Sequence, residues 1–399
     1  MGNCRTSPTN NAIGFCLLPS ELIERILLCL ALPEIIRFKL VSKTVASIIS
    51  HQDFVRQYNL RLRSTTWLFL FKKRCHRYSL LDGFAERSDR WFRIPISNLL
   101  KPFIFPGEDL FFLTAGGNIF LFASNSHQAV ITVNLVTNTV RKIPPTPLGP
   151  RGTCSWRRSG MKLLPGPIGS EHFRFLFAEL VENRPVVFEY DSETDKWQSM
   201  VAKEDDAGSL RVSERVGDHI FLSVMHGANE SSVIAIKSPN NTPVILRPRF
   251  DGRTGEDRQL TVGFSWGKSI DRLHVCGDGY MMIAKSDGVD GANTRVRMLK
   301  DIEMLGLGLN GRNWEMISKL PGKLMEQIKK PYGVMMGCLE GINGTINAVL
   351  MSNLEGLWDI IWLRYDIVGR QWTWVPLPDC RMKGLNMAGI AFSSGLTLP

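Results

Sequence analysis

Histidine and cysteine are the residue types here best suited to hold a metal ion, and neither forms a metal-ligand pattern. No Cys-x-x-Cys pair occurs, and His219 and His226 flank one strand-like run from which they would point apart. We therefore expect no metal ion, and free thiols in a reducing compartment rather than a disulfide framework. The histidines are at 51, 76, 127, 172, 219, 226 and 274, and the cysteines at 4, 16, 29, 75, 154, 276, 338 and 380.

Acidic and glycine-rich stretches do not form a catalytic or phosphate-binding site either. Glu204-Asp205-Asp206 lies in a polar stretch, which favours solvated carboxylates over catalytic ones. Gly277-x-Gly279 and Gly306-x-Gly308 fit turns, because no Lys-Ser/Thr follows them and no strand–helix–strand unit surrounds them. We predict no catalytic residue and no cofactor, and we expect a non-catalytic protein.

The first residues match an acylation pattern. MGNCRT places Gly2 and Thr6 as N-myristoylation requires, and Cys4 could carry a second, reversible acyl chain. Two lipids anchor a protein where one does not, so a membrane-attached scaffold is one hypothesis. The alternative is a disordered polar leader over residues 1–14. No secretory signal is recognisable, and the longest apolar runs are far too short to cross a bilayer.

The net charge of +10 is concentrated between Arg61 and Arg93, with Lys72 to Arg77 at its centre. Nucleic-acid binding would require a long basic face with interleaved aromatic residues. A single cluster instead indicates a solvated loop or a weak contact for an acidic partner. We therefore expect no nucleic-acid partner.

Three short helical patterns lie between Leu17 and Phe54. Ser20 is placed to cap the first helix, Pro33 lies just inside the second, and Ser42 can cap the third. Helices of this length are not stable alone, so they must pack on one another. Three short helices do not bury all of their apolar side chains, so some should stay at the surface and need a partner. The apolar positions are Leu22, Ile23, Ile26, Leu27, Leu30, Ile35, Ile36, Leu40, Val41, Val45, Ile48 and Ile49.

The order and spacing of these residues resemble an F-box, the helical motif by which substrate receptors attach to the Skp-type adaptor of cullin–RING ubiquitin ligases. Many F-boxes have Trp where Val45 stands, a change that keeps the position apolar but leaves volume unfilled. The alternative is that the helices only cap the domain that follows. The resemblance implies adaptor binding through Leu18, Pro19, Leu22, Ile23, Ile26, Leu40, Val41 and Lys43.

After Thr66 the sequence changes to runs of four to seven apolar or aromatic residues, broken by Gly, Pro, Asn and Asp. This punctuation is typical of strands and turns. Only Lys323 to Lys330 has a helical pattern in this part. So many short strands indicate a sandwich array, a solenoid or a propeller.

One hairpin template recurs, best seen in Tyr190-Asp191-Ser192-Glu193-Thr194-Asp195-Lys196-Trp197. A strand ends at the first apolar residue, polar residues turn the chain, and the next strand begins at a bulky anchor seven positions on. The anchor should pack against the neighbouring hairpin. A degenerate copy runs from Ile236 to Val244, and the copies recur at steps of roughly 50–60 residues. The clear anchors are Trp91, Val140, Trp197, Trp314 and Trp372.

Together with Gly116-Gly117, which fits an inner strand needing close backbone approach, these copies resemble kelch repeats. The whole chain resembles the plant-type F-box/kelch proteins. The expected fold class is α+β and multidomain: a small helical F-box followed by an all-β, kelch-like propeller of six blades, with five or seven as alternatives. Leu385 to Ser393 is the expected strand that closes the ring. The expected domains are a leader (1–14), an F-box (15–60) and a propeller (61–399).

The resemblance implies a substrate-recognition subunit of an SCF-type ubiquitin ligase. Its partners would be a Skp-type adaptor, through it a cullin, and an unidentified protein target held by the propeller loops. Such a receptor raises the local concentration of target lysines and does no chemistry itself. We expect a cytoplasmic or nuclear protein, at a membrane only if Gly2 or Cys4 is acylated. The alternative is a ligand-binding or oxidase-type propeller whose helices serve only as packing.

Overall fold

A computed structural model describes most of the chain. The described residues are 18–62, 65–74, 78–94, 96–104, 110–125, 128–156, 159–167, 170–204, 219–226, 230–237, 242–250, 272–289, 296–309, 311–342, 344–378, 382–383, 386–394 and 396–398. The leader with Gly2 and Cys4 lies outside them, as does the centre of the basic cluster, Cys75 to Arg77.

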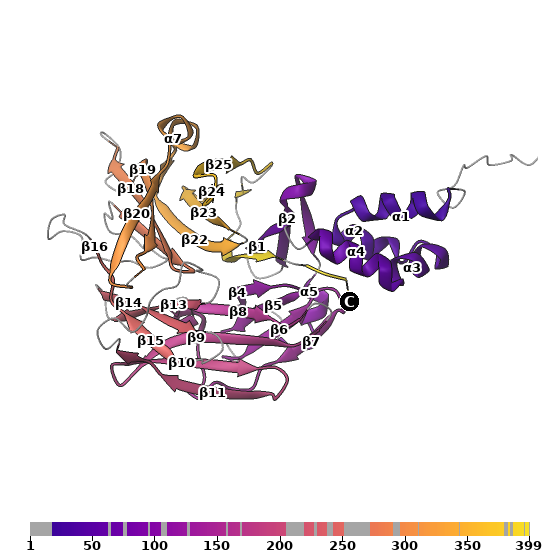
Figure 1. The fold of residues 1–399 in the computed structure, drawn as a ribbon, viewed down its shortest axis with the longest axis horizontal. Helices are drawn as coiled ribbons and strands as arrows, with labels where there is room; N and C mark the ends of the chain where they lie inside the picture. The colour runs from indigo at the N-terminus through magenta and orange to yellow at the C-terminus, as the bar shows by residue number, and fades with distance from the viewer. Residues whose placement is uncertain are drawn as a thin grey trace, which may run out of the picture.

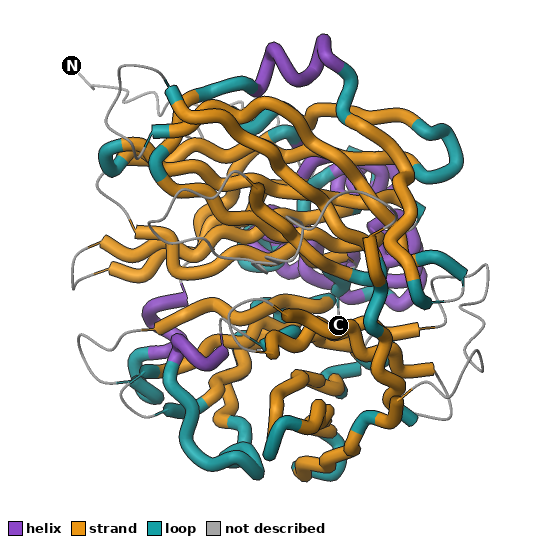
Figure 2. The backbone as a smooth tube through the Cα atoms, turned by 90° about the vertical axis from the view of Figure 1, so that its left-hand side faces the viewer, coloured by secondary structure: helices purple, strands orange, loops and turns teal. Residues whose placement is uncertain are grey.

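Four N-terminal helices are followed by six sheets that form a β-propeller (Figure 1). Figure 2 views the propeller from the side opposite these helices, which therefore lie behind the strands. The helices are α1 (Ser20–Cys29), α2 (Leu32–Phe38), α3 (Lys43–Ser50), α4 (Gln52–Leu62), α5 (Ile96–Leu100), α6 (Thr153–Trp156) and α7 (Gly322–Ile328), with a 3-10 turn at Glu86–Ser88.

The helix starts follow local side-chain chemistry. The Ser42 hydroxyl accepts a hydrogen bond from Val45 N at 3.1 Å and caps α3, as the sequence predicts. In α2, Pro33 occupies the first turn, and the Glu34 carboxylate accepts from Ala31 N at 2.8 Å. The prediction for Ser20 is wrong, because Ser20 is already helical and Pro19 takes the cap position without a side-chain bond.

The first three blades follow the N-terminal helices in sequence, except for one strand of blade 1 that comes from the C-terminal part of the chain. Blade 1 contains β27 (Asn386–Ser394), β1 (Thr66–Arg74), β2 (Tyr78–Ala85) and β3 (Arg90–Ile94). Blade 2 contains β4 (Leu110–Gly116), β5 (Ile119–Ser124), β6 (Val130–Asn134) and β7 (Thr139–Lys142). Blade 3 contains β8 (Met161–Pro165), β9 (Phe173–Val181), β10 (Arg184–Asp191) and β11 (Lys196–Val201).

Blades 4 and 5 each end in a two-residue strand parallel to its neighbour. Blade 4 contains β13 (His219–His226), β14 (Glu230–Lys237), β15 (Pro243–Leu246) and β12 (Lys203–Glu204). Blade 5 contains β17 (Arg272–Gly277), β18 (Tyr280–Gly288), β19 (Arg297–Leu307), β20 (Asn313–Lys319) and β16 (Arg249–Phe250), with β21 (Pro331–Tyr332) beside β19. Blade 6 contains β22 (Val334–Ile342), β23 (Thr345–Leu354), β24 (Leu357–Asp366) and β25 (Gln371–Val375), with β26 (Met382–Lys383) beside β24.

The ring is closed by the C-terminal strand, as the sequence predicts. β27 pairs antiparallel with β1 and supplies blade 1 with a strand from the opposite end of the chain. The six-blade count and the short helix near residue 323 are also confirmed. Alternation along β1 lets it serve two interfaces. Phe69 and Phe71 make edge-to-face contacts with Phe120 and Phe122 of blade 2, whereas Leu68 packs toward blade 6.

The repeat template coincides with the strand register. Each template residue faces the anchor seven positions on, across a hairpin to the outermost antiparallel strand. The degenerate copy follows the same register, with Ile236 opposite Pro243. The facing pairs are Phe84 and Trp91, Val133 and Val140, Tyr190 and Trp197, Leu307 and Trp314, and Tyr365 and Trp372.

Three of the Trp anchors tie their blade to the preceding one. Trp91 Nε1 donates to Pro378 O at 2.7 Å, from blade 1 to the chain after blade 6. Trp197 Nε1 donates to Pro144 O at 2.9 Å, from blade 3 to the chain after blade 2. Trp372 Nε1 donates to Ser318 Oγ at 2.9 Å, from blade 6 to blade 5. The indole therefore supplies both apolar area and one directional bond between blades.

Glycine allows two blades to approach closely. A Cβ on Gly116 at the end of β4 would lie 3.1 Å from Leu163 O in blade 3, and one on Gly277 would lie 2.0 Å from Leu339 O in blade 6. The close backbone approach that we expected for Gly116 is therefore present.

Lys72 departs from the solvated loop that we expected for the basic cluster. Its ammonium is buried 2.7 Å from Asp82 Oδ2 and lies over the Trp91 ring.

Candidate functional site

Helix α1 has one exposed and one buried apolar face. Leu18, Leu22 and Ile26 are 37%, 44% and 42% exposed, whereas Ile23 and Leu27 are 3% and 0% exposed. Residues four apart share one side of a helix, so Leu22 and Ile26 form an apolar stripe along α1, and Leu18 lies two residues before the helix. Ile23, which we grouped with the adaptor-binding residues from the sequence, instead belongs to the core of the helical unit.

A second exposed apolar group lies between α2 and α3. Leu40 and Val41 are 87% and 66% exposed, although both are large aliphatic residues. Lys43 follows as the first residue of α3 and is also exposed, as is Pro19 at the start of α1. A docking surface requires exposed apolar residues, and Leu40 and Val41 provide them shortly after the α1 stripe in the sequence.

Val45 occupies the position at which the resemblance would place Trp. Its side chain is 1% exposed and packs in the same core as Ile49 and Leu27. The helical unit therefore accepts the smaller residue as a buried one. The substitution changes the interior of the unit and not its exposed surface.

The opposite side of the helical unit packs on the propeller. Leu32 and Ile35 of α2, and Phe54 and Tyr58 of α4, belong to one continuous core with residues of blades 1 to 3. An ion pair between Arg90 of β3 and Glu34 of α2 adds to this contact. The helices thus have two roles: one side holds the propeller, and the other is left uncovered by the described residues.

The C-terminal segment 396–398 is held between the two domains by two asparagine side chains. Asn59 of α4 donates to Leu398 O at 3.0 Å and accepts from Leu398 N at 2.8 Å. Asn118, in the turn after β4, donates to Thr397 O at 2.8 Å and accepts from Thr397 N at 2.9 Å. The buried backbone of these residues is therefore satisfied by amides from both domains.

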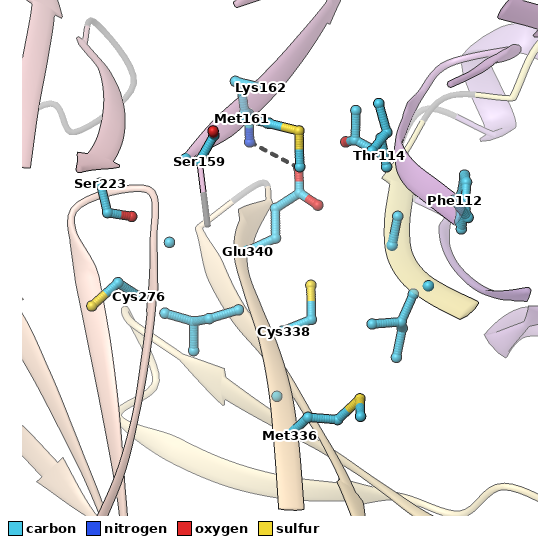
Figure 3. Close-up of a pocket in the computed structure, with 18 of the residues that line it drawn as sticks. Phe112, Thr114, Ser159, Met161, Lys162, Ser223, Cys276, Met336, Cys338 and Glu340 are labelled. Carbon is cyan, nitrogen blue, oxygen red and sulfur yellow. Dashed lines mark hydrogen bonds and ion pairs between the residues drawn. The ribbon is translucent and has the colours of Figure 1, made fainter. Parts of the chain in front are cut away.

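A cavity of about 240 Å³ lies where strands of several blades converge near the centre of the propeller (Figure 3). Lys162 of β8 enters it and lies 2.8 Å from Glu340 Oε1 of β22 and 2.9 Å from Asp278 Oδ2 of the β17–β18 turn. Asp278 also accepts a hydrogen bond from Gly341 N at 3.0 Å. Blades 3, 5 and 6 are therefore connected by one charged cluster.

Burial and charge act on the pKa values of this cluster in opposite directions. Burial lowers the pKa of Lys162, but Glu340 and Asp278 together raise it above its usual value. Burial raises the pKa of Glu340, which Lys162 only partly offsets. Two thiols of the same cavity, Cys276 and Cys338, have pKa values raised to about 12, mainly by burial. They are therefore protonated and unreactive near neutral pH.

The cavity holds an ion-pair cluster and two protonated thiols. The three charged groups satisfy one another, and the thiols are not thiolates. In the described part of the chain, no cluster of three or more His, Cys, Asp or Glu side chains is arranged to hold a metal ion. None of the helices described here has the length and apolar character to cross a membrane.

Some sequence features lie outside the described residues. Gly2 and Cys4 are among them. Gly263-Phe264-Ser265-Trp266-Gly267, which matches the G-x-S-x-G pattern, also lies outside the described residues. That pattern marks a nucleophile only where it joins a strand to a helix. The Lys162 cluster could not be recognised in the sequence. Asp278 and Glu340 lie 116 and 178 positions after Lys162, and the three residues share no local motif.

Comparison with known families identifies the helical unit. Residues 15–57 match the F-box domain. The N-terminal helices are therefore an F-box domain, and a six-bladed propeller follows it. No curated protein matches the chain.

Similar solved structures match over most of the chain but at low scores. TolB from Acinetobacter baumannii is 10% identical over 87% of this chain and 73% of its own, with a TM-score of 0.39. A nidogen/laminin complex is 8% identical over 84% and 100%, with a TM-score of 0.41. Apo AztD from Citrobacter koseri is 11% identical over 84% and 100%, with a TM-score of 0.31. Such scores say nothing about function.

Proposed function

We propose that this chain is the substrate-recognition subunit of an SCF-type ubiquitin ligase. The F-box docks a Skp-type adaptor and through it a cullin, and the propeller binds the protein target. The chain itself is non-catalytic. The observation that carries the proposal is the apolar surface that the F-box domain leaves uncovered on the side away from its propeller contacts.

The docking surface consists of the stripe on α1 and the exposed residues around the α2–α3 connection. Burying such large aliphatic side chains against a partner would contribute roughly 1.5–3 kcal/mol each before the costs of association. Ile23 is left out because it is already buried. The proposed docking residues are Leu18, Pro19, Leu22, Ile26, Leu40, Val41 and Lys43.

A firm join between the two domains suits a receptor of this kind. The F-box and blades 1 to 3 share one core, and Asn59 and Asn118 hold the C-terminal segment between them. A target bound to the propeller would then keep a defined position relative to the adaptor. Ubiquitin transfer by proximity depends on such a fixed geometry.

The test is copurification with a Skp-type adaptor, using the full chain. Leu40→Asp places a charge at an 87% exposed position, so the fold should tolerate it while the interface should not. We expect at least a tenfold loss of adaptor affinity by titration calorimetry. The double variant Leu18→Asp with Pro19→Ala should lose the adaptor as well.

The matched control is Val368→Asp, at an 89% exposed position in the turn after β24. It introduces the same charge at equal exposure but in blade 6, and should bind the adaptor like the unmodified chain. Stoichiometric adaptor retained by both docking variants would reject the surface. No adaptor binding by the unmodified chain would favour the alternative function, a ligand-binding or oxidase-type propeller whose helices serve only as packing.

The finer assignments belong to the same proposal. The recurring hairpin register supports a kelch-type propeller of the plant F-box/kelch class. A cytoplasmic or nuclear location follows from the proposed role, and membrane association would require acylation of Gly2 or Cys4. The intact mass of the N-terminal peptide from plant cells tests this, since an unmodified Gly2 or a retained Met1 rejects the lipid.

A further inference from the structure

A second cavity lies at the join between the F-box and the propeller. It measures about 450 Å³, which is within the range of roughly 300–1,000 Å³ for small-molecule sites. Helix α2 forms one wall with Leu32, Pro33 and Ile36, and the propeller forms the other. The propeller wall comes from β1, β3, α5, the β6–β7 turn and Leu396 of the C-terminal segment. Cavities between domains are preferred places for ligands.

The propeller wall contains a buried donor without a partner. Trp67 lines the cavity, is 1% exposed, and stacks on Phe69 with ring centroids 5.7 Å apart. Its Nε1 has no hydrogen-bond partner among the residues that the structure describes. A buried indole N–H normally donates to something, because leaving it unpaired is unfavourable. The Nε1 atom has almost no accessible surface, so Trp67 contributes only apolar surface to the cavity.

The charged residues that line this cavity are all basic. Arg37 of α2 and Arg93 of β3 contribute guanidinium groups, and no acidic residue is among the described lining. The Arg93 side chain is 71% exposed, and its Nε lies 3.7 Å from Asp82 Oδ1, so it remains available to an anion. Two arginines beside an apolar interior match a molecule with an apolar body and a carboxylate.

We propose that this cavity binds a small, ring-containing carboxylic acid. The ring lies between α2 and the Trp67–Phe69 wall, and the carboxylate pairs with Arg37 and Arg93. Because the two walls belong to different domains, the bound acid stabilises the join between F-box and propeller. The site is separate from the proposed docking surface and does not depend on ligase function.

The experiment titrates the full chain with naphthalene-2-carboxylate and, in parallel, with naphthalene-2-carboxamide, its neutral analogue. For probes of this size we expect the acid to bind one site with a dissociation constant of about 1 mM or lower, and the amide at least about tenfold more weakly. Thermal unfolding should shift upward with the acid in proportion to its occupancy.

Two variants separate the apolar and the charged contributions. Arg37→Gln with Arg93→Gln should keep the fold and bind acid and amide equally weakly. Val136→Trp, in the β6–β7 turn, should fill the cavity and abolish binding of both. The matched control is Arg56→Gln with Arg184→Gln, two exposed arginines outside the cavity, which should leave both affinities unchanged.

The proposal is overturned if the unmodified chain shows no saturable binding of the acid. It is also overturned if the double arginine variant keeps the preference for acid over amide. Should Val136→Trp fail to fold, the arginine variant decides alone, because its side chains lie at the exposed mouth and the core is untouched. Equal loss of affinity in the Arg56 and Arg184 control would mean that the acid responds only to net charge, which also rejects the site.

Discussion

Asn59 of the F-box and Leu398, next to the C-terminal residue, exchange two hydrogen bonds, at 2.8 and 3.0 Å, across 339 positions of sequence. Leu398 is 1% exposed, so its backbone groups have no access to water if this exchange is lost. The segment around Leu398 therefore connects the propeller to the F-box. After β27 completes blade 1, the next residues fix the ring to the F-box.

The first prediction concerns this exchange. Asn59→Leu keeps the side-chain size but leaves the buried N–H and C=O of Leu398 unpaired, at a cost of about 1–3 kcal/mol for each group. We expect a loss of roughly 2–4 kcal/mol in the free energy of unfolding, measured in urea. Limited proteolysis should also cut between α4 and β1 more rapidly, since the join is weakened.

Gln57→Leu is the control for that prediction, because Gln57 lies on the same helix and is exposed. It should change stability by less than about 0.5 kcal/mol. An Asn59→Leu chain as stable as this control would show that the two bonds do not hold the domains together.

The second prediction concerns the Trp anchors of the repeat. Trp372→Phe removes the N–H that reaches Ser318 of blade 5 but keeps most of the ring area. We expect a loss of about 1–2 kcal/mol in unfolding free energy, from the lost bond and the smaller ring. Trp374→Phe, two residues along the same strand, is the comparison, since Trp374 is half-buried and has no such interblade bond in the described structure. Equal losses in the two variants would argue against the bond.

The anchors also show how far the sequence could be used to predict the structure. The seven-residue offset predicts a hairpin because strand register is local, and Tyr190 opposite Trp197 and Tyr365 opposite Trp372 confirm it. Helix periodicity predicts α1 to α3 for the same reason. Periodicity could not show which of two adjacent apolar residues, Leu22 or Ile23, faces outward, because that depends on what packs against α1.

Features made from distant segments were not predictable. The Asn59–Leu398 exchange, the Lys162 cluster and the cavity at Trp67 each join residues that are far apart in the sequence, and their residue types are ordinary in each local context. Lys72 was misassigned for a different reason. Its partners are near in the sequence, but only the hairpin pairing of β1 with β2, and of β2 with β3, places Asp82 and the Trp91 ring against its ammonium.

The third prediction concerns pH. His274 of β17 is 4% exposed, and burial, with Arg272 and Lys285 nearby, lowers its pKa to about 4. The pKa of a histidine in the unfolded chain is near 6.5, so the unfolded state binds a proton more tightly than the folded state does. His274 therefore contributes stability above pH 6.5 that is lost as the pH falls toward 4. Between pH 7.5 and pH 5 we expect a loss of about 2 kcal/mol from this group.

His274→Leu should remove that share of the pH dependence. Unfolding in urea at a series of pH values between 7.5 and 5 measures it. The slope of stability against pH should be shallower in the variant than in the unmodified chain. Parallel curves for the two chains would show that His274 does not titrate in this way.

The last prediction concerns the charged cluster of the central cavity. Lys162→Met removes the only cation within bonding distance of Asp278 and Glu340 among the described residues, and leaves two carboxylates close together in a largely enclosed place. Breaking a buried pair from one side costs about 3–5 kcal/mol, and we expect a loss near the lower figure because the side chains keep 18–23% of their surface accessible. Burial already raises the pKa of Glu340, so its protonated form is favoured. The stability lost in Lys162→Met should therefore grow as the pH rises above the usual pKa of a glutamate. Unfolding free energies measured in urea at pH 4.5 and pH 8 test the sign of this pH dependence.

The control is Lys300→Met, which breaks an exposed pair with Asp287 and should cost less than about 1 kcal/mol at either pH. Adding Glu340→Gln to Lys162→Met should recover part of the loss at pH 8 by removing one of the two charges. If the double variant is no more stable than Lys162→Met alone, the loss comes from packing rather than from the unpaired carboxylates.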